Sequence, residues 1–347
     1  MKMKKKLTIL LSLLLFGAFV MAQEDDKPGL SISGSVDTYW KYDLSGYVSD
    51  EGTSNIGTSF ADNQNSISIG MLDIALSQTV GKASFVGEFS FGPRSFKSIP
   101  TFQIDADDDI NINIQNLYIT YAFTEKISMT AGYMGTFVGY EVISPVPNFN
   151  YSTSYLFSFG PFQNAGLKLD WTILDNLSVM VGIFNDWNVY QDFNGISDFG
   201  AQVYWAPVEG WDLSVNFLTG DPSGTIIDVT TSYQITDKFF LGLNAATYSA
   251  PDSDAGYSGV ALYPQFAFSD LFSLGWRPEY FKIRNGESSV SDENVFANTI
   301  TGNFQMGPMR FLAEWRLDSG SSDFFVDGDT NPASSASQIL LAAIYAF

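Results

Sequence analysis

The charged residues best suited to chemistry stand at alternating positions within otherwise apolar segments of the chain. Paired carboxylates can serve as acid and base in glycoside hydrolysis, and carboxylates that face basic side chains can sort charged solutes. The 347 residues include no histidine and no cysteine, which excludes Ser-His-Asp triads, cysteine nucleophiles and zinc sites built on those ligands. The charged residues of this kind are Asp37, Lys41, Glu88, Lys168, Asp170, Arg277, Glu279, Arg310, Glu314 and Arg316.

The residue types and their spacing do not favour catalysis. No spacing places two of the carboxylates opposite each other, so we expect no enzyme activity, no cofactor and no metal. The densest acidic run, Asp105–Asp109, lacks the turn glycine and the distal glutamate of a calcium loop, and we interpret it as a solvated loop. With 38 acidic and 17 basic residues, a net charge of −21, the chain is not expected to bind nucleic acid.

The charges are carried by segments in which apolar and polar residues alternate, the pattern of β-strands with one apolar and one polar face. In the first segment Ile32, Val36 and Trp40 alternate with Asp37 and Lys41. We expect an all-β chain of about sixteen strands whose charges share one face. The predicted strands span 30–42, 65–78, 83–92, 111–123, 127–134, 163–172, 176–186, 197–206, 210–219, 225–235, 238–248, 258–268, 271–282, 295–306, 308–318 and 337–347.

Two of these strands break the alternation. In 65–78 and in 111–123 the apolar residues change sides midway along the segment. A β-bulge inserts one unpaired residue and so restores the faces. The sequence therefore predicts one bulge near Gly70-Met71 and another near Gln115.

The connections between the strands alternate in length. Turns of a few residues, such as 80–82 and 124–126, alternate with longer loops such as 43–64 and 93–110. In an antiparallel up-and-down meander the short turns then lie at one end, with both termini, and the long loops at the other. This arrangement is typical of transmembrane outer-membrane β-barrels, which have short periplasmic turns and long extracellular loops. A soluble β-sandwich or propeller is the alternative.

The N-terminal residues have the composition of a cleavable signal peptide. Lysines precede an apolar stretch over 7–20, and Ala22 ends a cleavage site. We therefore expect residues 1–22 to be removed, 23–29 to form a short periplasmic tail and 30–347 to form the barrel.

The connection 135–162 differs from the other long loops because it is rich in aromatic residues and poor in charge. Such a loop would be poorly solvated outside the barrel, so we expect it to fold inward as a constriction. The alternatives are a lid over the rim and a contact with a neighbouring subunit. The candidate constriction residues are Tyr140, Glu141, Phe149, Tyr151, Tyr155 and Phe157.

Residues 132–187 resemble the β-barrel porin-2 family, also called OmpL-like porins. The similarity is carried by motifs at 139–141 (Gly-Tyr-Glu), 148–152 (Asn-Phe-Asn-Tyr-Ser) and 160–161 (Gly-Pro), and 32–40 is similar to the family's first strand. The resemblance implies an outer-membrane barrel that acts as a porin. It implies no catalytic residue and no rule for selectivity.

These observations predict an outer-membrane channel for passive diffusion of small hydrophilic solutes, with a mild cation preference from the acidic excess. Tyr345 and Phe347 share one face of the last strand, which resembles the signal read by the barrel assembly machinery. The other expected partners are outer-membrane lipid and further copies in a homo-oligomer. Lumenal charges that pair across strands would instead brace the wall.

Two other functions stay open at this point. One is a non-conducting barrel that presents its loops for adhesion or scaffolding. The other is a substrate-specific transporter, for which an inward aromatic track would be the mark. The residues that could form this track are Tyr39, Tyr118, Tyr204 and Tyr263.

Overall fold

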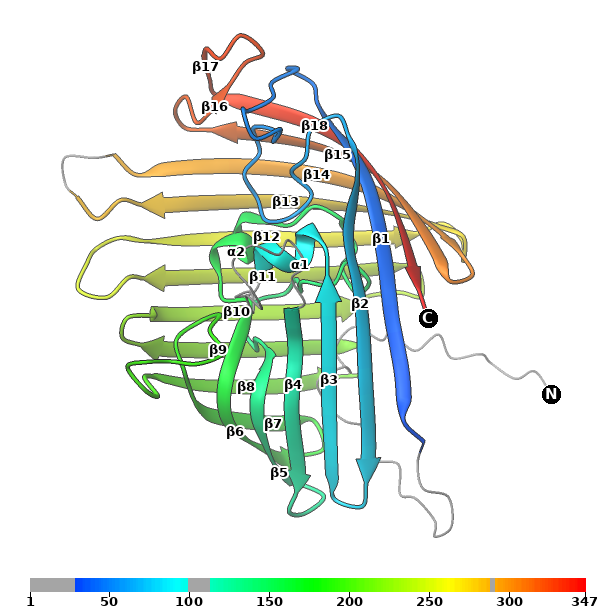
Figure 1. Ribbon diagram of the computed structural model, residues 1–347, viewed down its shortest axis with the longest axis vertical. Coiled ribbons are helices and arrows are strands. Elements are labelled where there is room, and N and C mark those ends of the chain that lie inside the picture. Colours follow the sequence, from blue (N-terminus) through cyan, green and yellow to red (C-terminus); the bar gives the residue numbers. More distant parts are fainter. Residues whose placement is uncertain (1–28, 99–112, 288–290) are drawn as a thin grey trace, which may run out of the picture.

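The computed structural model describes residues 29–98, 113–287 and 291–347. The expected signal peptide, nearly all of the expected tail and the acidic run Asp105–Asp109 lie outside these residues. Sixteen antiparallel strands form a closed barrel, as the alternation predicted (Figure 1).

Each barrel strand pairs with its neighbours in the chain, and the first strand closes the ring on the last, β18. The short pair β16 (Phe325–Val326) and β17 (Pro332–Ala333) forms a separate hairpin. The barrel strands are β1 (Ser31–Asp43), β2 (Ile67–Val80), β3 (Ala83–Phe91), β4 (Asn113–Ala122), β5 (Ile127–Gly135), β6 (Gln163–Leu174), β7 (Leu177–Phe184), β8 (Asp198–Val208), β9 (Trp211–Gly220), β10 (Gly224–Gln234), β11 (Phe239–Ser249), β12 (Gly256–Ala267), β13 (Phe272–Arg284), β14 (Glu293–Met306), β15 (Met309–Gly320) and β18 (Ser335–Ala346).

Both predicted bulges are confirmed by the strand register. Between β1 and β2 the pairing jumps so that Gly70 and Met71 together lie opposite Asp37. The Met71 amide donates to the Asp37 carboxylate at 3.0 Å, and a Cβ on Gly70 would lie 1.7 Å from that carboxylate. Between β3 and β4 the pairing skips Gln115. The first bulge therefore positions the inward carboxylate of Asp37 beside Gly70, because any larger residue at position 70 would collide with it.

The outer face of the barrel is apolar and carries aromatic residues near the short turns. Trp171, Trp205 and Trp211 are all exposed and stand next to the turns that end β6 and β8. Aromatic side chains at this height match the interfacial girdle of a barrel embedded in lipid.

Two short helices were not predicted from the sequence. They are α1 (Pro93–Ser98) and α2 (Tyr155–Phe159), and both lie within the ring of strands in Figure 1. Neither carries an alternating or helical pattern long enough to detect. No helix among the described residues has the length and apolar character needed to cross a membrane.

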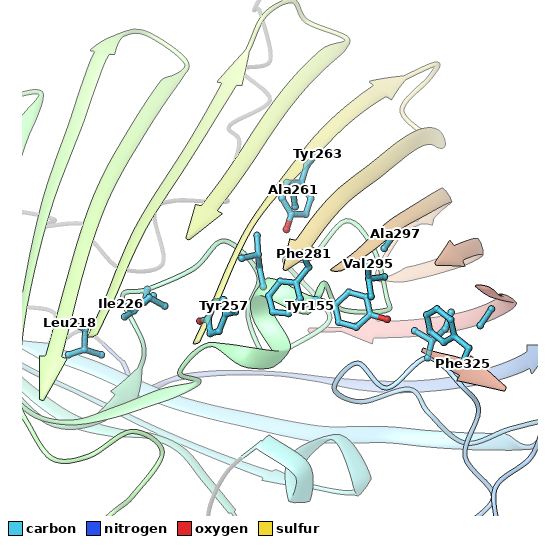
Figure 2. Packing of buried hydrophobic residues seen from close by; sticks show 14 of the residues in the cluster. Tyr155, Leu218, Ile226, Tyr257, Ala261, Tyr263, Phe281, Val295, Ala297 and Phe325 are labelled. Atoms are coloured by element: carbon cyan, nitrogen blue, oxygen red, sulfur yellow. The ribbon is translucent and has the colours of Figure 1, made fainter. Parts of the chain in front are cut away.

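The main buried apolar cluster lies inside the barrel, between α2 and the inner wall (Figure 2). Tyr155 of α2 stacks on Phe281 of β13 with ring centroids 5.6 Å apart, and Tyr257 of β12 lies 5.3 Å from the same ring. The part of the cluster around Tyr155 lies against β11, β12 and β13, which α2 contacts, and other members extend along the wall to Leu218 of β9 and Ala336 of β18.

Candidate pore and its inward-folded segment

The connection between β5 and β6, residues 136–162, lies inside the barrel and is called the inner segment below. Its tyrosine hydroxyls bond inward carboxylates: Tyr151 donates to Asp37 of β1, and Tyr155 donates to Asp318 of β15 at 2.8 Å. Burial and the neighbouring carboxylates raise the pKa of both tyrosines, so their hydroxyls keep the protons that they donate.

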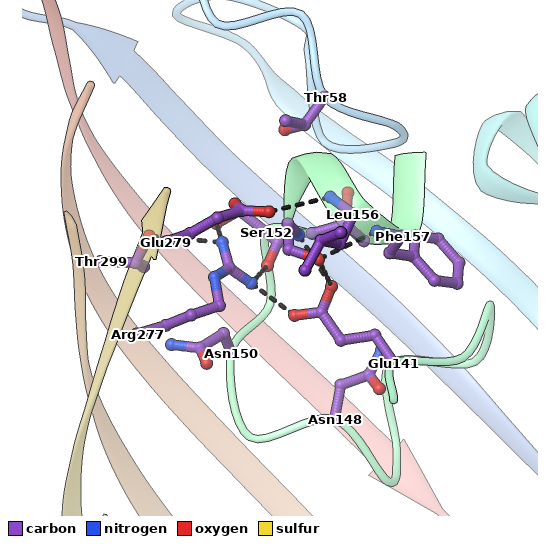
Figure 3. Close-up of polar contacts among 12 residues, drawn as sticks. Thr58, Glu141, Asn148, Asn150, Ser152, Leu156, Phe157, Arg277, Glu279 and Thr299 are labelled. Carbon is purple, nitrogen blue, oxygen red and sulfur yellow. Dashed lines mark hydrogen bonds and ion pairs between the residues drawn. The ribbon is translucent and has the colours of Figure 1, made fainter. Parts of the chain in front are cut away.

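The strongest tie between the inner segment and the wall is a buried ion pair. Arg277 of β13 donates to Glu141 at 2.6 Å and to the Ser152 carbonyl at 2.6 Å (Figure 3). Glu141 also accepts from the amide and the hydroxyl of Ser154, each at 2.7 Å. Buried ions need such additional hydrogen bonds, because they have lost water.

Wall carboxylates also bind the backbone of the inner segment. Glu279 of β13 accepts from the amides of Tyr155 and Leu156, at 2.9 and 2.8 Å, which are free donors in the first turn of α2. Glu314 of β15 accepts from the Tyr151 amide at 3.1 Å. These contacts replace hydration for both the carboxylates and the amides.

Arg316 of β15 holds the middle of the inner segment. It forms an ion pair with Asp318 at 2.8 Å and donates to the Thr153 carbonyl at 2.8 Å. Its guanidinium also lies 5.2 Å from the centroid of the Tyr155 ring. A planar guanidinium suits this site because it can bond and stack at once.

Two inward glycines of the wall make room for aromatic rings of the inner segment. A Cβ on Gly242 of β11 would lie 2.3 Å from the Tyr140 hydroxyl, and one on Gly275 of β13 would lie 2.3 Å from the Phe149 ring. Tyr140 also stacks on Tyr263 with centroids 4.1 Å apart. In the sequence, the only mark of these two contact sites is a glycine at an inward position of a strand.

A third element, α1, also holds the inner segment, through hydrogen bonds from Arg94. Arg94 is buried and donates to the carbonyls of Ile143 and Tyr151, at 2.9 and 3.1 Å. Its guanidinium lies 4.8 and 4.7 Å from the ring centroids of Phe60 and Tyr151. Arg94 was missed in the sequence because it stands outside the alternating segments.

The charges expected to line the pore fall into two groups. One group points inward but is covered, so the expectation that it lines open lumen needs correction. The physical reason is that the inner segment covers this part of the wall and supplies hydrogen-bond partners to the carboxylates and arginines in place of water. The covered residues, each at most 4% exposed, are Asp37, Lys41, Arg277, Glu279, Glu314 and Arg316.

The second group keeps contact with the lumen: Glu88, Lys168, Asp170 and Arg310 are half-buried. Lys168 and Asp170 of β6 form an ion pair of 3.1 Å and remain 15% and 23% exposed. Glu88 accepts from Asn116 of the next strand.

Among the candidate constriction residues, Glu141, Tyr151, Tyr155 and Phe157 are buried, whereas Tyr140 and Phe149 are half-buried. The residues considered for an aromatic track do not lie together on the open lumen, because two of them are covered. Tyr39 and Tyr263 are buried, and Tyr118 and Tyr204 are half-buried.

Phe347 and Tyr345 lie at the seam that closes the barrel. Phe347 exchanges two backbone hydrogen bonds of 3.0 Å with Gly34, and Tyr345 pairs with Val36 of β1. Both side chains are exposed on the outer face.

The fold matches solved outer-membrane barrels at low sequence identity. The outer-membrane channel DcaP of Acinetobacter baumannii has a TM-score of 0.65 and 12% identity, covering 92% of this chain and 98% of that one. OmpF of Salmonella typhi, in complex with daunomycin, has a TM-score of 0.63 and 10% identity, covering 92% and 98%.

A trimer form of OmpT of Vibrio cholerae has a TM-score of 0.59 and 12% identity, covering 93% of this chain and 100% of that one. No curated protein sequence matches the chain. The sequence model of the family described as "Putative beta-barrel porin-2, OmpL-like" matches residues 29–347. The chain therefore belongs to this OmpL-like family of outer-membrane porins.

Proposed function

We propose that this porin conducts small hydrophilic solutes by passive diffusion along the part of the lumen that the inner segment leaves open. The observation that carries the proposal is the division of the inner wall. Charged residues on β1, β13 and β15 are buried under the inner segment, whereas Glu88, Lys168 and Asp170 on β3 and β6 keep contact with water. A sixteen-stranded barrel is too wide for side chains alone to fill.

We further propose a mild preference for cations. Lys41, Arg277 and Arg316 are buried, and the two arginines are bonded to the inner segment, so solutes do not meet these three cations. Of the half-buried charged residues, Lys168 and Asp170 pair with each other and Arg310 donates to the Pro145 carbonyl of the inner segment, so the acids Glu88 and Asp212 carry the proposed preference. A surplus of accessible carboxylates raises the local concentration of cations.

Planar bilayers with a potassium chloride gradient test both statements. Stepwise current with a reversal potential of the cation-selective sign is the expected result. Anion selectivity would contradict the cation preference. A reconstituted barrel with no current steps would contradict the channel and favour a surface barrel that presents its loops.

We also propose that the protein is anchored by outer-membrane lipid, assembles as a homo-oligomer and is delivered by the barrel assembly machinery through Phe347. The apolar outer belt and the place of Phe347 at the seam support this. Mass measurement of the detergent complex by light scattering tests the oligomer. Deletion of Phe347 should lower the amount of assembled barrel in cells, with Tyr121→Phe, on the outer face, as control.

A further inference from the structure

The inner segment presents an apolar surface where its side chains are exposed. Val142 and Val146 are 44% and 37% exposed although they lie between anchored residues inside the barrel. Glu141 is the segment's only charged residue, and it is buried against Arg277. The segment's charge is therefore buried, whereas two of its valines are exposed.

Several polar side chains of the inner segment bond the wall, a neighbouring loop or the segment itself. Asn150 donates to the Thr301 hydroxyl of β14 at 2.6 Å, and Asn148 bonds the backbone of Val142 at 2.7 and 3.0 Å. Thr153 donates to the Ser59 carbonyl at 2.8 Å. No charge of the segment is therefore left to face a passing solute.

The surface across the lumen has the opposite character. In the ring of strands, β6 stands diametrically opposite β14, to which the inner segment is bonded. The ion pair of Lys168 and Asp170 lies on β6, in the half near the short turns. The tip of the inner segment reaches the same half, because Arg310 near the start of β15 donates to the Pro145 carbonyl at 2.5 Å.

We infer that this porin favours small organic cations with an apolar body, such as aryl- or alkylammonium ions, over polyhydroxylated cations of similar size. The inference rests on the proposed channel function and names the class of solute for it. The apolar body would lose water against Val142 and Val146, and the ammonium group would face Asp170 and Glu88. Each methyl group removed from water strengthens such an encounter roughly fourfold.

The test compares benzylammonium with protonated Tris in planar bilayers, each as the chloride against sodium chloride, using the full mature barrel. The wild type should be several-fold more permeable to benzylammonium than to Tris. The double substitution Val142→Thr with Val146→Thr keeps side-chain shape and adds two hydroxyls. It should lower this ratio several-fold and leave sodium conductance unchanged. Val48→Thr, at an exposed valine between β1 and β2, should leave the ratio unchanged.

Equal permeability of the two cations in the wild type, or a ratio that the double substitution leaves intact, would overturn the inference. A channel that conducts sodium but does not distinguish benzylammonium from Tris would contradict only this inference. A barrel that conducts no ion would contradict the proposed function. If the double variant does not fold, the test is how strongly benzylammonium and Tris block the sodium current of the wild type. Block by benzylammonium at lower concentrations than by Tris supports the inference, and block by both at equal concentrations contradicts it.

Discussion

The inner wall of the barrel has two unlike halves. On β13 and β15 the side chains of Arg277, Glu279 and Arg316 are buried and bonded to the inner segment. On β6 the charged side chains pair with each other and keep contact with water, as Lys168 does with Asp170. The alternation of the strands is the same on both sides, so the difference arises from the inner segment, which covers the charges of β13 and β15 and also reaches β8 and β10 through Phe137 and Gly139. Lumenal charge in this porin therefore anchors the inner segment on one side and stays in contact with water on the other.

The largest expected effect is the loss of the cation that anchors the covered half. Arg277→Met leaves Glu141 and Glu279 buried without their neutralising partner, which should lower the free energy of unfolding by about 3–5 kcal/mol. Urea-induced unfolding in lipid vesicles measures this. Lys168→Met on the open half should cost about 1 kcal/mol or less, because its pair is partly solvated. Equal losses of unfolding free energy in the two variants would contradict the distinction between the two halves.

A steric change at the wall should have the next largest effect. Gly275→Ala places a methyl group against the Phe149 ring and should destabilise the barrel by roughly 1–3 kcal/mol. Phe149→Ala in the same chain should recover part of this loss, because it removes the ring that the new methyl group would meet. Gly87→Ala, where the nearest neighbour would lie 3.8 Å away, is the matched control. If Phe149→Ala did not restore stability, the proposed contact between Gly275 and the Phe149 ring would be wrong.

Removal of one hydroxyl should weaken the anchor more mildly. Tyr151→Phe deprives the buried Asp37 carboxylate of a donor and should cost about 1–3 kcal/mol. Tyr121→Phe, on the exposed outer face, should change stability little. Single-channel recordings of Tyr151→Phe should also show added current noise as the inner segment loosens. Quiet channels of unchanged stability would show that this contact does not hold the segment.

The smallest effect on stability, but a clear one on selectivity, is expected on the open half. Lys168→Glu removes an accessible cation and adds an anion beside Asp170. The reversal potential in a potassium chloride gradient should move further toward cation selectivity, while the unfolding midpoint stays close to that of the wild type. An unchanged reversal potential would mean that β6 does not border the conducting path.

The strands and both bulges were predictable because alternation is a local signal that survives in the barrel. The bulge at Gly70-Met71 left its mark as a change of phase in one short stretch. The inward folding of the aromatic connection could also be expected from its composition. Which charges it covers could not, because the pair of Glu141 and Arg277 joins residues far apart in the chain. Arg94 had no periodic pattern to reveal it.

Single cysteines offer the most direct test of the division of the wall, since the natural chain has none. Ser128 pairs with Asp170 on the open half, and Thr299 pairs with Arg277 on the covered half. A charged, membrane-impermeant thiol reagent should modify Ser128→Cys readily and reduce the current, whereas Thr299→Cys should stay unmodified until the protein is unfolded. Equal rates of modification at the two positions would contradict the account.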